Sequence, residues 1–317
     1  MALTALGTAD LVHRALKTGT VIPGFNIPYL PMMEPVVRAL RDTNSFGLIM
    51  VARLEWVKFE SGSLEAIRDE YERVKDLDHT RLHLDHVPVI DEDDLRVDYQ
   101  EIVERAVRAG YGSVMVDGSR LPLEGNIDCT KAVVEIAHAA GIPVEAELGA
   151  IMGHEAGPLP PYDELFESGR GFTDPAQAKR FVEETKVDWL SIAIGNIHGA
   201  ISAARKSERK IEARLDINRL DEIREAVGIP LVLHGGTGIG KEYIIKSVQH
   251  GIAKVNVATA IRQPYEKAVQ KSLAAGQEAV YRAMLAIIRE DLEIGNSAAR
   301  LAWELDNPVG GKVVTSG

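Results

Sequence analysis

The sequence predicts an α/β protein folded as a single closed (β/α)₈ barrel, the TIM-barrel architecture. Two observations lead to this prediction. Short apolar runs rich in Val, Ile and Leu alternate with longer amphipathic stretches, and there are eight of the short runs. Short buried runs are typical of parallel strands, whereas amphipathic stretches are typical of the helices that connect them. A doubly wound open sheet is the alternative arrangement of the same alternating elements.

The predicted strands are residues 21–27, 46–51, 81–86, 113–117, 143–148, 189–195, 230–234 and 253–257. Helical patterns lie between most of them, at residues 31–43, 100–109, 130–140, 174–185 and 220–227. Gly141 and Gly228 follow two of these helices, where glycine commonly ends a helix. Residues 264–317 are predicted as a C-terminal helical extension, in which Pro264 suits the first turn of a helix.

Composition narrows the class of protein. The 317 residues are 45% hydrophobic and 26% charged, and a chain of this length buries about 75% of its unfolded surface. The net charge of −11 and the lack of a basic patch argue against a nucleic-acid partner. No apolar run reaches the roughly 18–20 residues of a membrane span, and the N-terminus lacks signal-peptide features. One cysteine, Cys129, excludes an intrachain disulfide, so we expect a cytoplasmic protein.

Polar residues gather where the predicted strands end. His86, His198 and His234 lie at three such ends, and in a barrel all strand ends face one mouth. Converging imidazoles with an open fourth position are typical of catalytic zinc, and Glu147 and Asp117 could complete or flank the site. The alternative is that each histidine only makes hydrogen bonds in its own loop.

Two further segments could bind charged ligands. Gly235-Gly236-Thr237-Gly238 follows the seventh strand, where barrels often bind phosphate through backbone N–H groups, although turns need glycine in any case. Five acidic residues lie in residues 88–99, and we interpret this run as a solvated loop rather than a cation site.

Six motifs in order resemble the class II, metal-dependent ketose-bisphosphate aldolases, which include fructose- and tagatose-bisphosphate aldolases. They are His83-Leu-Asp-His86, Ser113-Val-Met-Val-Asp-Gly-Ser119, Val144-Glu-Ala-Glu-Leu-Gly149, Ala193-Ile-Gly-Asn-Ile-His-Gly199, Leu233-His-Gly-Gly-Thr-Gly238 and Lys254-Val-Asn-Val-Ala-Thr259. The resemblance covers residues 11–266, and it implies a TIM barrel, in agreement with the strand count.

The resemblance also implies an activity. Members of the family cleave a ketose phosphate reversibly into dihydroxyacetone phosphate and an aldehyde, through an enediolate that a zinc ion stabilises. The expected cofactors are one catalytic Zn²⁺, a second Zn²⁺ site and, as a further candidate, a monovalent cation. The expected partners are a small-molecule sugar phosphate and further copies of the chain in a homodimer or homotetramer.

The roles that the resemblance implies fall on residues matching the family motifs. The metal-binding set is His86, His198, His234, Glu147 and Asp117. Asp85 matches the acid/base at the reacting bond, and Glu155 matches a glutamate in a mobile loop implicated in proton transfer. The substrate- and phosphate-binding set is Asn26, Gly199, Gly235, Gly236, Thr237, Asn256 and Thr259.

The chain departs from the family around the substrate. Ala52 stands where family members usually have a serine of the phosphate site, and the loop after His86 is longer than in the family. These differences leave other functions open. One is a metal-dependent aldolase or epimerase acting on a different, unphosphorylated donor, and another is a non-catalytic subunit that binds sugar phosphates.

Overall fold

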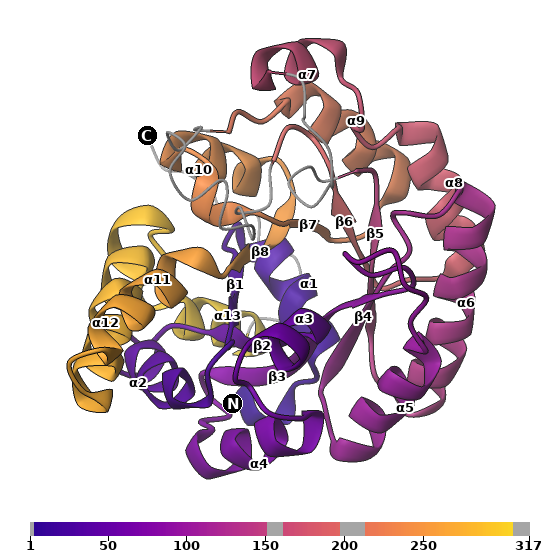
Figure 1. Ribbon diagram of the computed structural model, residues 1–317. Coiled ribbons are helices and arrows are strands. Elements are labelled where there is room, and N and C mark those ends of the chain that lie inside the picture. Colours follow the sequence, from indigo (N-terminus) through magenta and orange to yellow (C-terminus); the bar gives the residue numbers. More distant parts are fainter. Residues whose placement is uncertain (1–2, 151–160, 197–212, 307–317) are drawn as a thin grey trace, which may run out of the picture.

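The computed structural model describes residues 3–150, 161–196 and 213–306, and shows the predicted closed barrel (Figure 1). All eight strands run parallel and pair in chain order, and β1 also pairs with β8 to close the sheet. The prediction of a (β/α)₈ barrel is therefore confirmed, and an open doubly wound sheet is excluded. The strands are β1 (Ile22–Asn26), β2 (Gly47–Ala52), β3 (Thr80–Pro88), β4 (Ser113–Asp117), β5 (Val144–Leu148), β6 (Trp189–Ile192), β7 (Leu231–Leu233) and β8 (Ile252–Val257).

Alternation along the strands divides the core into two parts. Residues such as Leu82 and Leu84 on β3 point outward and join the apolar layer between barrel and helices. Their neighbours His83 and Asp85 belong to the opposite face of the strand and lie inside the barrel, each almost completely buried. A smaller apolar cluster, which includes Trp189, fills the lower interior. The mouth of the barrel is thus the place where inward-facing polar side chains collect.

Helices surround the barrel in the expected rhythm. They are α1 (Thr8–Thr18), α2 (Met33–Asp42), α3 (Arg53–Lys58), α4 (Leu64–Val74), α5 (Tyr99–Ala109), α6 (Leu123–Ala139), α7 (Tyr162–Ser168), α8 (Pro175–Thr185), α9 (Ile217–Val227) and α10 (Lys241–Gln249). Side chains that accept a hydrogen bond from the first turn start several of them, as Asp98 does for α5 and Asp174 for α8. None of the helices in the described ranges is long and apolar enough to span a membrane.

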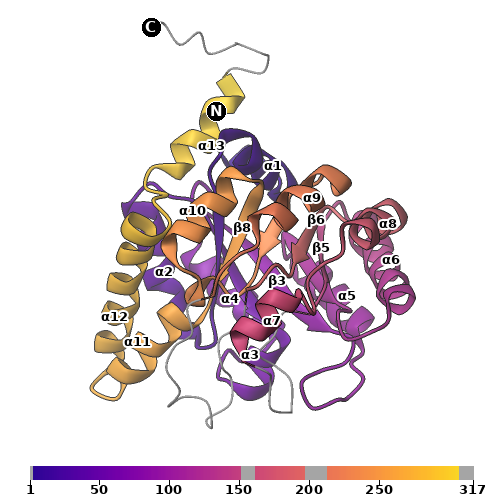
Figure 2. The ribbon, with the colours of Figure 1, turned by 90° about the horizontal axis from the view of Figure 1, so that it is seen from above.

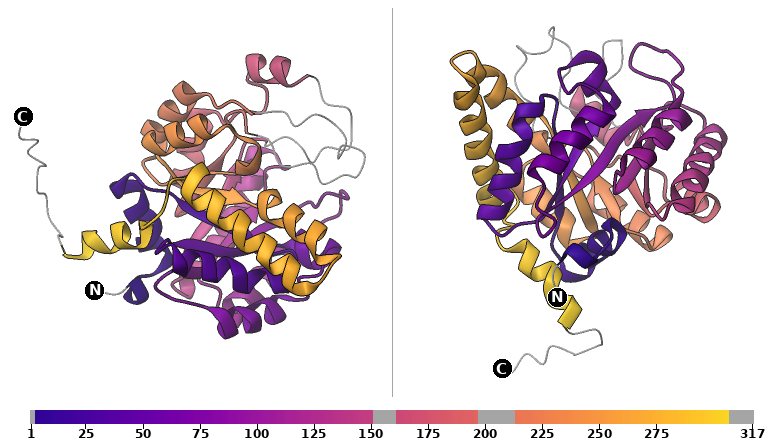
Figure 3. Two further views of the ribbon diagram at one scale, coloured as in Figure 1. Left: turned by 90° about the vertical axis from the view of Figure 1, so that its left-hand side faces the viewer. Right: turned by 90° about the horizontal axis from the view of Figure 1, so that it is seen from below.

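The C-terminal helices pack against helices on the outside of the barrel (Figures 2 and 3). They are α11 (Thr259–Val269), α12 (Leu273–Ala286) and α13 (Ser297–Asp306), with α12 lying against α2 and α13 against α1. The expectation that Pro264 opens a helix is wrong, because α11 begins five residues earlier, directly after β8. The Ser297 hydroxyl accepts the Phe46 N–H at 2.9 Å, which ties this extension to the start of β2.

Candidate active site

A cleft opens at the mouth of the barrel, and eight of the predicted site residues line it. They are Asn26, Asp85, His86, His234, Gly235, Thr237, Asn256 and Thr259. They come from four strands, β1, β3, β7 and β8, or from the segments that follow them, so distant parts of the chain meet at one place, as the argument from strand ends predicts. The roles assigned to these residues remain predictions, whereas their shared position is a property of the fold.

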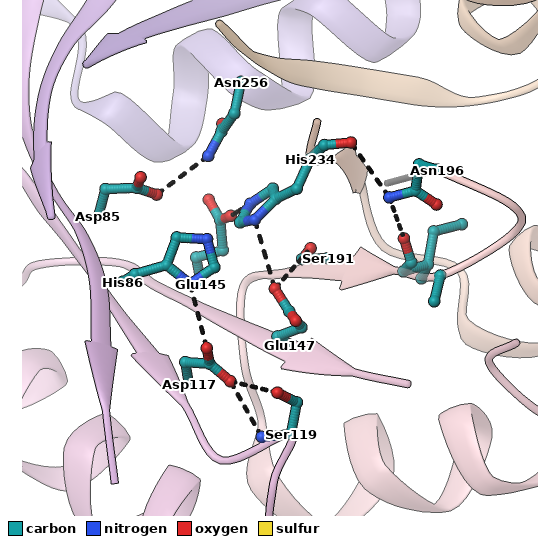
Figure 4. A network of polar contacts seen from close by, with 12 residues as sticks. Asp85, His86, Asp117, Ser119, Glu145, Glu147, Ser191, Asn196, His234 and Asn256 are labelled. Atoms are coloured by element: carbon teal, nitrogen blue, oxygen red, sulfur yellow. Dashed lines mark hydrogen bonds and ion pairs between the residues drawn. The ribbon is translucent and has the colours of Figure 1, made fainter. Parts of the chain in front are cut away.

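Asp85 lies at the centre of this arrangement and is 2% exposed. The Asn26 amide donates to Asp85 Oδ2 at 2.9 Å. The Asn256 amide donates to Asp85 Oδ1 at 3.0 Å, as Figure 4 shows. Burial disfavours the carboxylate, but the His86 imidazole and the Lys254 ammonium outweigh it and lower the pKa of Asp85 to about 2. The carboxylate is therefore ionised at neutral pH and fixed in direction by two amides.

His86 and His234 face each other beside Asp85. Their ring centroids are 4.6 Å apart and their planes are nearly perpendicular. His86 Nδ1 lies 3.2 Å from Asp117 Oδ2, and His234 Nδ1 lies 3.3 Å from Glu147 Oε2. Figure 4 shows the two histidines and the two carboxylates converging from β3, β4, β5 and the end of β7.

These side chains form two candidate metal sites. Ligand atoms of Asp85, His86 and His234 lie within 4.8 Å of one another, and so do those of His86, Asp117 and Glu147. The carboxylates of Asp85 and Asp117 overcome the effect of burial and raise the pKa of His86 to about 10. The negative potential of these carboxylates, which favours a proton on His86, also favours a divalent cation at the same place. Imidazole and carboxylate groups are ligands that Zn²⁺ accepts. The residues present therefore fit a metal centre.

Further hydrogen bonds hold the candidate metal-binding residues in place. Ser119 donates to Asp117 Oδ1 from both its hydroxyl, at 2.6 Å, and its backbone N–H, at 3.0 Å. Asn196 donates to the His234 carbonyl at 3.1 Å and accepts the Ile194 N–H at 2.9 Å. Bonds of this kind orient ligands and are typical of metal sites.

The predicted site residues do not include a buried polar cluster beneath the mouth, which is formed by Glu145, Lys254 and Trp189. Glu145 Oε1 lies 2.8 Å from His234 Nε2, and Glu145 Oε2 lies 2.8 Å from the Lys254 ammonium and 2.6 Å from the Trp189 indole nitrogen. Burial opposes ionisation of Glu145, but Lys254 outweighs it and lowers the pKa of this carboxyl well below its usual range. The period of two on β5 offered a signal, because Glu145 must share the inward face of Glu147.

The glycine loop after β7 brings backbone close to β8. A Cβ on Gly236 would meet Val255 Cγ1 at 2.6 Å and the Asn256 carbonyl at 2.9 Å, so no larger residue fits there. Gly235 has φ of 73°, a conformation that favours glycine. The loop thus lies directly beside Asn256, in the place where the sequence predicts a phosphate site.

The wall of the cleft at the end of β2 carries apolar side chains and one buried acid. Ala52, Leu54, Glu55 and Phe59 line it. Glu55 is 6% exposed, and its Oε2 accepts the Ala52 backbone N–H at 2.8 Å. Burial raises the pKa of Glu55 to about 8. The position expected for a phosphate-binding serine therefore carries an alanine with a buried acid beside it.

The acidic loop after β3 is held by basic side chains. Asp91 pairs with Arg53 at 3.1 Å, and Asp93 pairs with Lys58 at 2.8 Å. Arg120 also donates to this loop at the Asp91 carbonyl. These bonds support the interpretation of the acidic run as a structural loop rather than a cation site.

Three predicted site residues lie outside the described residues. They are Glu155, His198 and Gly199. The third predicted histidine ligand and the proton-transfer glutamate therefore stay predictions.

Comparison with known proteins places this geometry in one family. Residues 7–299 match the sequence model of the class II fructose-bisphosphate aldolases, so the chain belongs to that family. It is a metal-dependent aldolase, a lyase that makes and breaks carbon–carbon bonds.

Solved structures agree. The YdjI aldolase of Escherichia coli K12 is 27% identical, with 92% of this chain and 98% of that chain covered and a TM-score of 0.70. A putative fructose-1,6-bisphosphate aldolase of Coccidioides immitis is also 27% identical, with 93% and 99% covered and a TM-score of 0.73. The fructose-bisphosphate aldolase of Campylobacter jejuni is 18% identical, with 92% and 99% covered and a TM-score of 0.70, and supports the fold.

Proposed function

We propose that the protein is a zinc-dependent aldolase that reversibly cleaves a ketose phosphate into dihydroxyacetone phosphate and an aldehyde. The observation that carries the proposal is the Asp85 carboxylate, held by two amides at the cleft beside His86 and His234. An ionised carboxylate in this position can accept the proton of a substrate hydroxyl.

The proposed roles follow from these contacts. His86 and His234, with His198 expected as the third ligand, would hold the catalytic ion, and Asp117 and Glu147 would hold a second ion with His86. The catalytic ion, when bound, would stabilise the negative charge that cleavage leaves beside the donor carbonyl. Asp85 takes the hydroxyl proton as the carbon–carbon bond breaks, and returns it in the synthetic direction.

The phosphate of the donor would lie against the glycine loop. Gly235, Gly236 and Thr237 offer backbone N–H groups there, with Asn256 and Thr259 on the neighbouring strand end and helix start. Binding at this distance from the reacting bond orients the donor, which lowers the entropy cost of reaching the transition state.

The test uses the donor alone. Metal-loaded protein is incubated with dihydroxyacetone phosphate in deuterated water, and loss of the hydroxymethyl proton signal is followed by NMR. We expect exchange that a chelator abolishes. A metal-loaded, folded protein that catalyses no exchange would contradict the proposal. Asp85 is tested in the full cleavage assay, where Asp85→Asn should lower kcat by 10²–10⁴-fold. Asp128→Asn, an exposed change on α6, is the matched control.

A second candidate donor has its own observation in favour. Glu55 occupies the wall beside Ala52, where the chain lacks a serine hydroxyl for a phosphate and offers a carboxyl group that can accept hydrogen bonds from substrate hydroxyls. The alternative is therefore an unphosphorylated hydroxyketone donor on the same catalytic site. Faster exchange with dihydroxyacetone than with its phosphate would favour this alternative.

A further inference from the structure

Lys254 is a motif residue to which the proposed chemistry gives no role. It lies on β8, and its side chain is completely buried inside the barrel. Its ammonium lies 2.8 Å from Glu145 Oε2 and donates to Asn256 Oδ1 at 2.6 Å. A buried ammonium is costly unless paired, so these two bonds hold it firmly in place.

Each partner of Lys254 leads to a different half of the active site. Asn256 links the Lys254 ammonium to Asp85, the proposed acid/base, because its amide nitrogen donates to Asp85 Oδ1 at 3.0 Å. Glu145 links the ammonium to His234, a proposed metal ligand, because its other carboxylate oxygen lies 2.8 Å from His234 Nε2. Figure 4 shows both of these second contacts, from Asn256 to Asp85 and around Glu145 and His234.

The orientation of the Asn256 amide depends on this arrangement. An amide has one end that only accepts and one end that only donates hydrogen bonds, and an ammonium can only donate. Lys254 therefore attracts the Asn256 oxygen, which turns the amide nitrogen toward Asp85. The reversed amide would place two donors against each other at one end and two acceptors against each other at the other end.

We propose that Lys254 is a positioning residue that orients Asn256 toward Asp85 and holds Glu145 against His234, so that one buried cation aligns the acid/base and a metal ligand together. The inference rests on the proposed function for its kinetic consequences. Its consequence for metal binding does not depend on the substrate.

Lys254 is poorly placed for a covalent role. A lysine that forms an imine with a carbonyl substrate must reach the substrate as a neutral amine. The cleft lining, over the part of the chain that the structure describes, does not include Lys254, and its nitrogen is engaged by Glu145 and Asn256. Treatment with borohydride in the presence of dihydroxyacetone phosphate should therefore leave the full-length enzyme unmodified at Lys254.

The experiment compares Lys254→Met with Lys246→Met, an exposed lysine on α10, in the full-length enzyme. We expect Lys254→Met to lower kcat in the full cleavage assay at least tenfold, with a smaller change in KM, because Asp85 acts in the cleavage step. We expect it also to weaken Zn²⁺ binding about tenfold, the usual effect of losing a group that orients a ligand, as measured by competition with a chelator. Lys246→Met should match the wild type in both measurements.

A double variant separates positioning from general damage. If Lys254 acts on Asp85 through Asn256, the cleavage kcat of Lys254→Met/Asn256→Ala at saturating Zn²⁺ should equal that of Asn256→Ala alone, because neighbours in one network are not additive. The pair Lys254→Met/Glu145→Gln removes both buried charges, and is the folded substitute should the single variant unfold. Its Zn²⁺ affinity should fall in the same way.

Different results would refute the proposed function and the positioning role of Lys254. If wild-type protein exchanges no proton, the proposed function fails, while the Zn²⁺ measurement still tests Lys254. If the wild type exchanges and a folded Lys254→Met variant keeps the wild-type cleavage kcat and wild-type Zn²⁺ affinity, the positioning role is refuted. A borohydride-trapped adduct on Lys254 would also overturn it, in favour of a covalent role.

Discussion

The ion pair between Glu145 and Lys254 allows a quantitative test of the barrel interior. Both side chains are completely buried, and the two charged atoms lie 2.8 Å apart. The perturbation is Glu145→Met or Lys254→Met, each of which leaves one buried charge without its partner. Methionine approximates the volume of both side chains, so the change acts mainly on charge and hydrogen bonding.

The expected magnitude follows from these contacts. Removing one partner of a buried ion pair typically destabilises a protein by about 3–5 kcal/mol. Glu145→Met also removes the acceptor of the Trp189 indole N–H, a loss of about 1–3 kcal/mol that overlaps with the first because both bonds use Oε2. We therefore expect Glu145→Met to lower the free energy of unfolding by about 4–6 kcal/mol and Lys254→Met by about 3–5 kcal/mol.

The assay is urea unfolding of the metal-free protein, since bound metal would add its own stabilisation. The double variant should recover most of the loss, because replacing a buried ion pair by apolar residues is often neutral or stabilising. The coupling free energy from the four proteins should be about 3 kcal/mol or more. Single variants that each cost less than about 1 kcal/mol, or additive effects, would refute the reasoning.

Three further predictions concern metal, loop and strand. Zn²⁺ at about 100 times its Kd should stabilise the protein by about 2.7 kcal/mol in thermal unfolding, and unchanged unfolding would argue against the metal centre. Gly236→Ala should destabilise by about 1–3 kcal/mol and raise the KM for dihydroxyacetone phosphate, because its Cβ would meet the Asn256 carbonyl at 2.9 Å. Gly238→Ala, with no atom within 4 Å of its Cβ, is the control and should change neither quantity. Asp188→Ala should cost about 1–3 kcal/mol in urea unfolding, because Asp188 accepts the Val144 N–H at 2.7 Å, and a loss below about 0.5 kcal/mol would contradict this.

The barrel could be predicted because each strand is a short apolar run whose outward residues pack under the helices. The limits of the elements were harder to predict. β6 ends at Ile192 rather than at residue 195, and α6 begins at Leu123, seven residues before the predicted helix. The sequence 123–129 mixes Gly, Asn and Asp, which are weak helix formers, with few apolar residues. Packing of α6 against β4 and β5 overrides that weak preference.

The mouth of the site could be predicted from strand ends alone. Asp85, His86 and His234 had to meet there once the strands formed a parallel barrel. The pairing of Glu145 with Lys254 could not be predicted in this way. The stagger between strands decides which inward-facing residues meet across a barrel. The register places Glu145 beside Trp189 and Lys254 beside Ile22, and no pattern in a single strand contains that information.

The position of the buried charges suggests a balance between stability and function. Beneath the cleft the interior is closed by apolar side chains such as Ile22, Leu48 and Val232, so water does not solvate Glu145 and Lys254 from below. An apolar pair at the same two positions would avoid the desolvation cost and could raise stability by about 1–4 kcal/mol. The same change would release His234 and the Asn256 amide from their partners. We therefore expect the Glu145→Met/Lys254→Met protein to be at least as stable as either single variant and far less active than the wild type. Greater stability with undiminished exchange would mean that the cluster serves the fold alone.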